Sequence, residues 1–215
     1  MLRYHVIPVT AFAQNCSLLW DDATPAPHEA AVIDPGGDLD RVLAEAQRLG
    51  LKIGQIWITH AHIDHAGGAG ALARQLAIPI IGPHRGDADW IAALPQQGAM
   101  FGFPPAQPFT PARWLVDGDT LVLAGHAIGV RHCPGHTPGH VVFHAPQIGR
   151  AFVGDVLFAG SIGRTDLMGG DADQLIDSIR ARLWPIGDET VFIPGHGPES
   201  TFGRERRNNP FVREI

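Results

Sequence analysis

The residues best able to do chemistry in this chain are histidines that lie close to aspartates. Residues 59–65 read Thr-His-Ala-His-Ile-Asp-His, which places three imidazoles and one carboxylate within six positions. Imidazole and carboxylate are ligands that zinc and similar divalent metals accept. The run therefore predicts a metal site, and its alternative interpretation is a solvated polar loop.

The spacing of these side chains indicates the backbone that must carry them. On a helix His60, His62, Asp64 and His65 would not share one face, and on a strand His65 would point away from the other three. A curled loop between a short buried strand at 56–58 and a helix beginning near Ala66 would let all four converge. The sequence thus predicts that a strand-to-loop junction carries the site.

Three further junctions of this kind follow along the chain. Residues 134–140, Pro-Gly-His-Thr-Pro-Gly-His, add the candidate ligand His136 and also His140, which opens an apolar strand and either coordinates directly or supports a ligand. Asp155 follows the strand at 151–153, and His196 lies in Pro-Gly-His-Gly after a strand at 190–193. We assign His140 the supporting role, together with Thr59.

The candidate ligands outnumber those of a single tetrahedral zinc. They are His60, His62, Asp64, His65, His136, Asp155 and His196. We expect two adjacent divalent metals, with zinc favoured and iron or manganese as alternatives, and with one carboxylate able to bridge them. Such a pair activates water as a nucleophile and polarises a carbonyl. Asp64 and Asp155 are the predicted catalytic carboxylates.

The elements that position these junctions can be predicted from apolar periodicity and turn residues. The predicted strands are 2–9, 15–20, 30–34, 56–58, 79–81, 114–116, 120–124, 127–132, 140–144, 151–154 and 190–193. The predicted helices are 39–49, capped by Asp38, and 71–77, 172–183 and 201–207, with a Pro-rich connection at 95–111. This order predicts an α/β protein with two sheets packed face to face, helices outside, and one domain over residues 1–215.

Composition excludes several other functions. The chain has 215 residues and a net charge of −6, so a nucleic-acid partner is not expected. The uncharged stretch 90–112 contains five prolines and three glutamines, which argues against a membrane span. Two cysteines, Cys16 and Cys133, are expected to be free in a cytoplasmic protein. A monomer and a homodimer are both compatible with the sequence.

The motif series resembles that of the metallo-β-lactamase superfamily. Its motifs are THAHIDH at 59–65, PGHTPGH at 134–140, GD at 154–155 and PGHG at 194–197. The resemblance implies a four-layer αβ/βα sandwich. It also implies a first metal on His60, His62 and His136, a second on Asp64, His65 and His196, and Asp155 as the bridge.

Within that superfamily the chain is most similar to glyoxalase II enzymes, the hydroxyacylglutathione hydrolases, and in particular to a short bacterial form. TAFAQNC at 10–16, GRTD at 163–166 and RRNNPF at 206–211 carry this closer match. It implies a thioesterase that cleaves S-lactoylglutathione to D-lactate and glutathione, as in methylglyoxal detoxification. Full-length glyoxalase II has an additional C-terminal helical region that binds glutathione, and this chain ends at Ile215, before such a region.

Two alternative activities share the fold. A persulfide dioxygenase with mononuclear iron has a similar GRTD segment, but its counterpart of PGHTPGH resembles HTPGC, whereas this chain has His140. A lactonase is the other alternative. Arg164, about ten residues beyond Asp155 in a glycine-rich loop, is the predicted contact for a carboxylate of a glutathione-like thiol, with a surface ion pair to Asp166 as the alternative.

Overall fold

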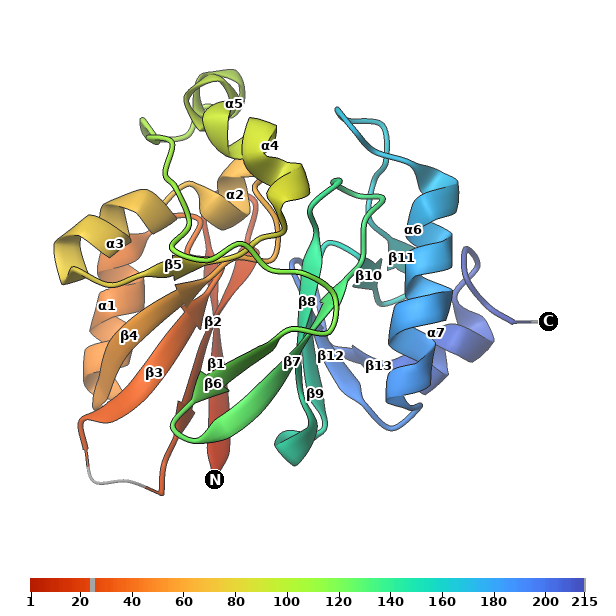
Figure 1. Ribbon diagram of the computed structural model, residues 1–215, viewed down its shortest axis with the longest axis horizontal. Helices are drawn as coiled ribbons and strands as arrows, with labels where there is room; N and C mark the ends of the chain where they lie inside the picture. The colour runs from red at the N-terminus through yellow and green to blue at the C-terminus, as the bar shows by residue number, and fades with distance from the viewer. Residues whose placement is uncertain (24–25, 215) are drawn as a thin grey trace.

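Two β-sheets face each other and helices cover both outer sides, as Figure 1 shows. The structure is a computed structural model that describes residues 1–23 and 26–214. The strand order is β1-β2-β3-β4-β5 in the first sheet and β13-β12-β9-β8-β7-β6 in the second. The predicted four-layer αβ/βα sandwich is therefore confirmed.

The first sheet combines antiparallel and parallel pairs. Strands β1 (Leu2–Val9), β2 (Gln14–Asp21) and β3 (His28–Ile33) are antiparallel neighbours, and β4 (Leu51–Trp57) and β5 (Ile80–Ile81) continue the sheet parallel to β3. The crossover from β3 to β4 runs through α1 (Leu39–Arg48), and that from β4 to β5 through α2 (Ile63–Ala66) and α3 (Ala69–Leu76). Figure 1 shows α1 and α3 on the outer side of this sheet.

The second sheet is an antiparallel meander extended by a parallel strand. Its strands are β6 (Thr120–Leu123), β7 (His126–His132), β8 (Val141–Ala145), β9 (Arg150–Gly154), β12 (Val191–Pro194) and β13 (Ser200–Thr201), with β12 parallel to β9. A two-stranded ribbon, β10 (Leu157–Phe158) and β11 (Ser161–Ile162), follows β9. Helices α6 (Ala172–Ser178) and α7 (Phe202–Asn208) cover the outer face.

Apolar side chains fill the space between the two sheets. Trp57 of β4 and Phe143 of β8 are fully buried there, with ring centroids 5.4 Å apart. Leu19 and Phe152 extend the same cluster. Central strands such as β8 and β9 are buried on both faces, between the other sheet and the helices, whereas the edge strand β6 alternates between buried and exposed residues.

Two local predictions need correction, and a third is confirmed in part. Residues 114–116 form no strand, since only the neighbouring Arg113 makes an isolated bridge, to Ile81. The stretch predicted as a Pro-rich connection contains most of α5 (Leu94–Phe101), preceded by α4 (Ala88–Ala92), because Pro95 lies in the first turn of α5, where its missing N–H costs nothing. Asp38 is the N-cap residue of α1, as predicted, but its side chain makes no capping hydrogen bond, and its carboxylate accepts the N–H of Thr10 instead.

The parallel strands bring their carboxyl ends to one edge of the sandwich, at the top of Figure 1. The loops after β3 and β4 leave the first sheet there, and those after β9 and β12 leave the second. Ligand sites of α/β sheets form outside such carboxyl ends. Cys16 and Cys133 are free, as predicted, and both are buried. None of the helices within the described residues is long and apolar enough to cross a membrane.

Candidate metal centre

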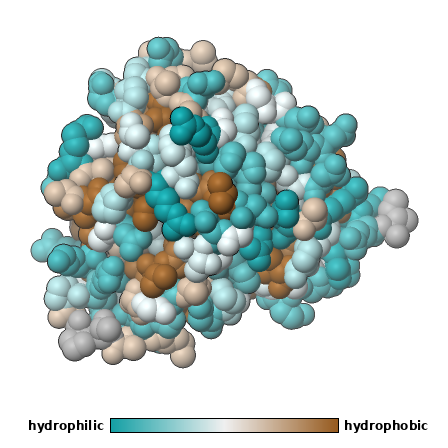
Figure 2. Space-filling model, in the orientation of Figure 1, coloured by the Kyte–Doolittle hydropathy of each residue, from teal (hydrophilic) through white to brown (hydrophobic). Residues whose placement is uncertain are grey.

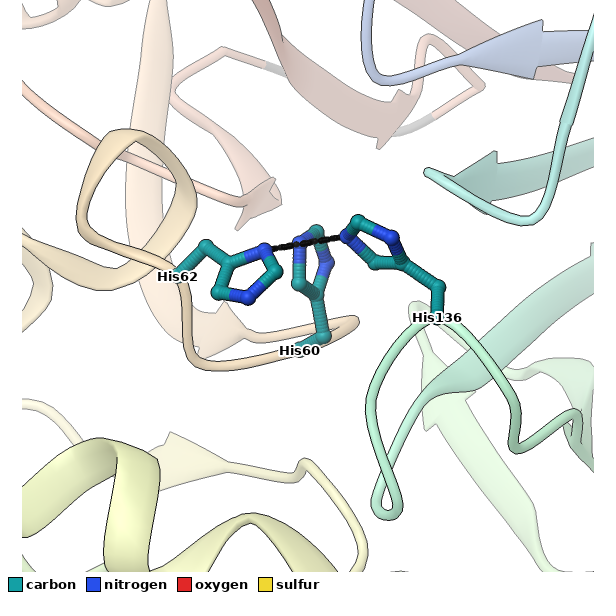
Figure 3. A group of neighbouring side chains, drawn as sticks. All are labelled: His60, His62 and His136. Carbon is teal, nitrogen blue, oxygen red and sulfur yellow. Dashed lines mark hydrogen bonds between the residues drawn. The ribbon is translucent and has the colours of Figure 1, made fainter. Parts of the chain in front are cut away.

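Three histidines from two loops converge at this edge. His60 and His62 follow β4, His136 lies between β7 and β8, and Figure 3 shows their rings turned toward one another. His62 Nδ1 lies 3.1 Å from His60 Nε2 and 2.9 Å from His136 Nε2, and the two Nε2 atoms are 3.2 Å apart. Ligand nitrogens on a tetrahedral zinc at 2.0–2.1 Å would be about 3.3 Å apart. The triangle of nitrogens therefore fits a divalent metal.

The hydrogen bonds on the far sides of these rings support that fit. His136 Nδ1 donates to the carbonyl oxygen of Arg164 at 2.7 Å, which leaves its Nε2 with a lone pair. The hydroxyl of Thr59 donates to Asp34, so at 3.1 Å its oxygen accepts from His60 Nδ1. The two Nε2 lone pairs therefore face each other, and a cation between them would relieve the repulsion.

A second group of donors lies beside the first. His196 Nε2 is 3.1 Å from Asp64 Oδ2, and its Nδ1 donates to the carbonyl oxygen of Phe12 at 3.1 Å. His65 is fully buried, and together with Asp64 and His196 it forms a set of three donor atoms lying within 4.8 Å of one another. One nitrogen and one carboxylate from α2 thus meet one nitrogen from the loop after β12. The predicted loop between β4 and a helix beginning near Ala66 is therefore corrected, because Asp64 and His65 lie in the short helix α2.

Asp155 lies between the two groups. Its Oδ1 is 3.3 Å from His65 Nε2, without the alignment of a hydrogen bond, and its Oδ2 is 3.7 Å from both His136 Nε2 and His196 Nε2. All seven residues predicted from the sequence as ligands are therefore brought together, with one carboxylate in contact with both groups. That arrangement suits two neighbouring cations.

The site combines ionised carboxylates, neutral imidazole rings and a ring, that of His65, that holds a proton. Burial lowers the pKa of His60 well below its ordinary value. Burial has the same effect on His65, but the carboxylates of Asp155 and Asp64 outweigh it and raise the pKa of His65 well above normal. Burial would raise the pKa of Asp155, but the facing imidazoles hold it well below its usual range. A metal cation held by these carboxylates would balance their negative charge in place of the proton on His65.

A buried carboxylate that sequence reasoning missed supports both groups. Asp34 follows β3, and its Oδ2 accepts from His65 Nδ1 at 2.9 Å and from the Thr59 hydroxyl at 2.6 Å, while its Oδ1 accepts the Thr59 N–H at 2.7 Å. It thus fixes the ring of His65 directly and that of His60 through Thr59. The signal was available, because Asp34 is an aspartate at the end of a buried strand, as Asp155 is.

His140 is in the predicted supporting position. Its Nε2 accepts the backbone N–H of Asp155 at 3.1 Å, and its ring stacks on that of His60 with centroids 4.6 Å apart. The nitrogen that could reach a metal is therefore engaged with the backbone that carries the bridging carboxylate. This geometry argues for orientation of Asp155 by His140.

A further pair of buried residues, also missed, joins the loops. Asp87 accepts the N–H groups of Ala61 and Gly139 and the hydroxyl of Thr137, so it links the loop after β4 to the loop between β7 and β8. Gln97 of α5 accepts the N–H of Ile63 and donates to the carbonyl of Ala61. No local sequence pattern marks either residue, because their partners are distant in the chain.

Arg164 contacts the candidate ligands through its backbone carbonyl and not through its guanidinium group. Its carbonyl orients His136, but its guanidinium makes a two-pronged ion pair with Asp166, at 2.7 and 2.8 Å. The alternative of a surface ion pair is thus the one the structure describes. Arg164 nevertheless lines the cleft of about 860 Å³ that opens over the donors.

Comparisons with known proteins agree with this geometry. The family model described as "Metallo-beta-lactamase superfamily" matches residues 9–196, a span that includes every candidate ligand. The chain belongs to the metallo-β-lactamase superfamily. Membership of this superfamily, together with a relative named as a hydrolase, identifies the protein as a metal-dependent hydrolase.

Similar superfamily members cover the chain almost end to end. A relative named hydroxyacylglutathione hydrolase GloC, from Haemophilus influenzae, is 43% identical over 98% of both chains. The crystal structure of the BLEG-1 B3 metallo-β-lactamase matches with a TM-score of 0.89 and 34% identity, covering 99% of this chain and all of that one. TTHA1623, solved in a di-iron-bound form, matches with a TM-score of 0.86 and 36% identity, over 97% and 100% of the two chains.

Asp34 orients His65 directly and His60 through Thr59, so its substitution should weaken metal binding in this superfamily member. Asp34→Asn should lower metal affinity about 10–100-fold, because the new amide group would face hydrogens on Thr59 and on His65 Nδ1. Asparagine tolerates the positive φ of 52° at this position, so the backbone should be unaffected. Competition with a chromogenic chelator would measure the affinity.

Asp38→Asn is the matched control for this substitution. Asp38 lies in the same loop with a φ of 47° and accepts a backbone N–H, but its partner is Thr10 and it does not line the cleft over the donors. The control should keep the wild-type affinity. Equal affinities in both variants would show that Asp34 does not orient the ligands.

Proposed function

We propose that this protein binds two divalent metals and hydrolyses acyl thioesters, with S-lactoylglutathione as the reference substrate and D-lactate and glutathione as products. The observation that carries the proposal is the pair of donor groups in contact through Asp155 at the floor of an open cleft. The proposed ligands are His60, His62 and His136 for one metal and Asp64, His65 and His196 for the other, with Asp155 shared.

The reaction consumes one water. Its oxygen forms a bond to the acyl carbon, the carbon–sulfur bond breaks, and the sulfur leaves as a thiolate. The two protons of the water pass to solvent, so the acyl product is a carboxylate, and the released thiolate takes up a proton from solvent. Bound divalent metals activate water and stabilise negative charge on a carbonyl oxygen. The chain itself must orient the ligand side chains. The Nδ1 atoms of His60, His136 and His196 make hydrogen bonds on the outer side of the site, and these bonds direct Nε2 of each ring toward its centre.

Apart from the candidate ligands, few polar side chains line the cleft, and thioester hydrolysis requires few. Besides the donors, its polar side chains among the described residues are Gln96, Gln97, Ser161 and Arg164, none of which is an acid that titrates near neutrality. A thiolate leaves without protonation, because thiols have pKa values near 8.5. An amide or an alkyl ester would require more help from an acid. This contrast favours thioesters.

The relative from Haemophilus influenzae supports the choice of reference substrate by its name, since it matches over almost the whole of both chains. The donor set of imidazoles and carboxylates suits zinc, which we propose, with iron or manganese as alternatives. TTHA1623 was solved in a di-iron-bound form, which keeps iron among the candidates. We place the activity in the cytoplasm, in keeping with the two free thiols.

Metal analysis with parallel assays tests this proposal. Protein purified without chelators should contain close to two metal ions per chain and should release thiol from S-lactoylglutathione. A single iron per chain, with oxygen consumption on glutathione persulfide and no thioester turnover, would instead establish a persulfide dioxygenase. Turnover confined to lactones would establish a lactonase.

The predicted role of Arg164 has its own test. Arg164→Ala should raise KM for glutathione thioesters about three- to fivefold, because an exposed ion pair with a substrate carboxylate is worth at most about 1 kcal/mol. Metal content and kcat should stay within about twofold, since His136 is oriented by the backbone carbonyl, which alanine retains. Steady-state kinetics on a glutathione thioester and on a small neutral thioester would separate the effects. Equal changes on both substrates would contradict a contact with the carboxylate.

A further inference from the structure

The cleft above the donors is far more apolar than lactate or glutathione requires. Ten of the nineteen residues lining it are apolar, five are candidate ligands and four are other polar residues. Its volume of about 860 Å³ lies in the range of sites that enclose a drug-sized molecule. A lactoyl group would fill only a small part of it.

The apolar lining comes from two opposite walls. Helix α5 contributes Met100 and Phe101 on one side, and the segment after β11 contributes Leu167 and Met168 on the other. Met100 is 77% exposed and Met168 is 54% exposed. Scattered exposed apolar residues are ordinary, and on the face drawn in Figure 2 the hydrophobic residues form small separate patches. In this cleft, by contrast, several exposed apolar side chains lie together beside the candidate ligands.

These walls are built as a fixed structure. The indole N–H of Trp90 in α4 donates to the carbonyl oxygen of Met168 at 3.1 Å, which joins the two sides, and the Trp90 ring meets that of His62 with centroids 4.5 Å apart. Phe12, from the turn between β1 and β2, packs edge-on against Phe101 with centroids 6.0 Å apart. An apolar group entering the cleft would therefore meet preformed surfaces.

Charge in the cleft gives little basis for recognising glutathione. Among the described lining residues Arg164 is the single lysine or arginine, and its guanidinium is already paired with Asp166. Glutathione carries two carboxylates and one ammonium group. The apolar surface thus outweighs the charged surface as a source of selectivity.

We infer that the cleft selects thioesters whose acyl group is apolar and larger than lactoyl, such as medium-chain or aromatic acyl groups. The acyl chain lies between α5 and the segment 167–168, and the thiol portion points to solvent at the mouth of the cleft. This inference rests on the proposed thioester hydrolysis and specifies its substrate class. Selection follows from the burial of methylene groups, each of which can raise kcat/KM by at most about fourfold.

A series of glutathione thioesters that differ only in the acyl group tests the inference. The metal-loaded full chain would be assayed with the lactoyl, acetyl, butanoyl and hexanoyl thioesters of glutathione. We expect kcat/KM to rise at least tenfold from acetyl to hexanoyl, and hexanoyl to exceed lactoyl. A flat or falling series with good lactoyl turnover would overturn the acyl preference and leave thioester hydrolysis intact. Absence of turnover with every thioester would overturn both.

Near-isosteric substitutions locate the effect in the cleft. In the double variant Met100→Gln/Met168→Gln both walls become polar with little change in length, so kcat/KM for the hexanoyl thioester should fall at least threefold while that for lactoyl stays within twofold. The control Val122→Thr makes the same kind of change at a 59% exposed position on β6, outside the cleft. It should leave both values within twofold. Equal losses for both substrates in the double variant would contradict an apolar acyl site.

Discussion

Replacing Asp155 by alanine is expected to reduce thioester hydrolysis at least about 1000-fold and to lower the metal content below two ions per chain. Its carboxylate lies 3.3–3.7 Å from nitrogens of both donor groups, so its removal affects both. Stabilisation of transition-state charge by a bound metal is worth several kcal/mol, and about 1.4 kcal/mol corresponds to a factor of ten in rate. Elemental analysis and steady-state kinetics on the same preparation would measure both effects.

Comparison of His140→Ala with Asp155→Ala distinguishes a residue that binds metal from a residue that orients a ligand. His140 accepts the Asp155 N–H and stacks on His60, and such supporting partners cost about 10–100-fold when removed. The His140 variant should therefore keep more metal and more activity than the Asp155 variant. Equal losses of metal and activity in the two variants would show that His140 is itself a ligand.

The donors could be predicted from the sequence because they cluster in short segments that follow the strands β4, β7, β9 and β12. Parallel strands place their carboxyl ends at one edge, so a local pattern of apolar run, glycine and then histidine or aspartate carries three-dimensional information. Asp155 and His196 follow neighbouring parallel strands in this way. Asp34 carries the same signal after β3, and it was missed because Pro-Gly-Gly after it resembles an ordinary turn.

The remainder of the site depends on contacts that no local pattern encodes. Asp87 and Gln97 join loops that lie 26 to 52 positions away in the chain, and their neighbours show no ligand-like spacing. Helix α5 was not predicted because a proline inside a helix usually breaks it. Pro95 is compatible with the helix only because it lies in the first turn, and the sequence alone does not show where that turn begins. The apolar wall of the cleft was consequently beyond prediction.

Gly195→Ala is expected to reduce activity at least about a hundredfold and to weaken metal binding, although it adds a single methyl group. A Cβ at this position would overlap Oδ1 of Asp155 and lie 2.6 Å from Cε1 of His65. The backbone cannot retreat, because the Gly195 N–H donates to Gly154 O at 2.7 Å and its carbonyl accepts the N–H of Asn15 at 2.7 Å. The carboxylate must move instead, and a misplacement of about 1 Å can cost about a hundredfold in rate.

Gly129→Ala provides the matched control for that substitution, since it also adds one methyl group to a glycine next to packed strands. At Gly129 in β7 the nearest atom to a new Cβ is 3.9 Å away, an ordinary contact. This variant should keep two metal ions per chain and activity within twofold of the wild type. Both variants should be checked by circular dichroism, so that a loss confined to Gly195→Ala reflects displacement of Asp155 and His65. Full metal content and activity in Gly195→Ala would mean that the bridging position of Asp155 is not required for the reaction.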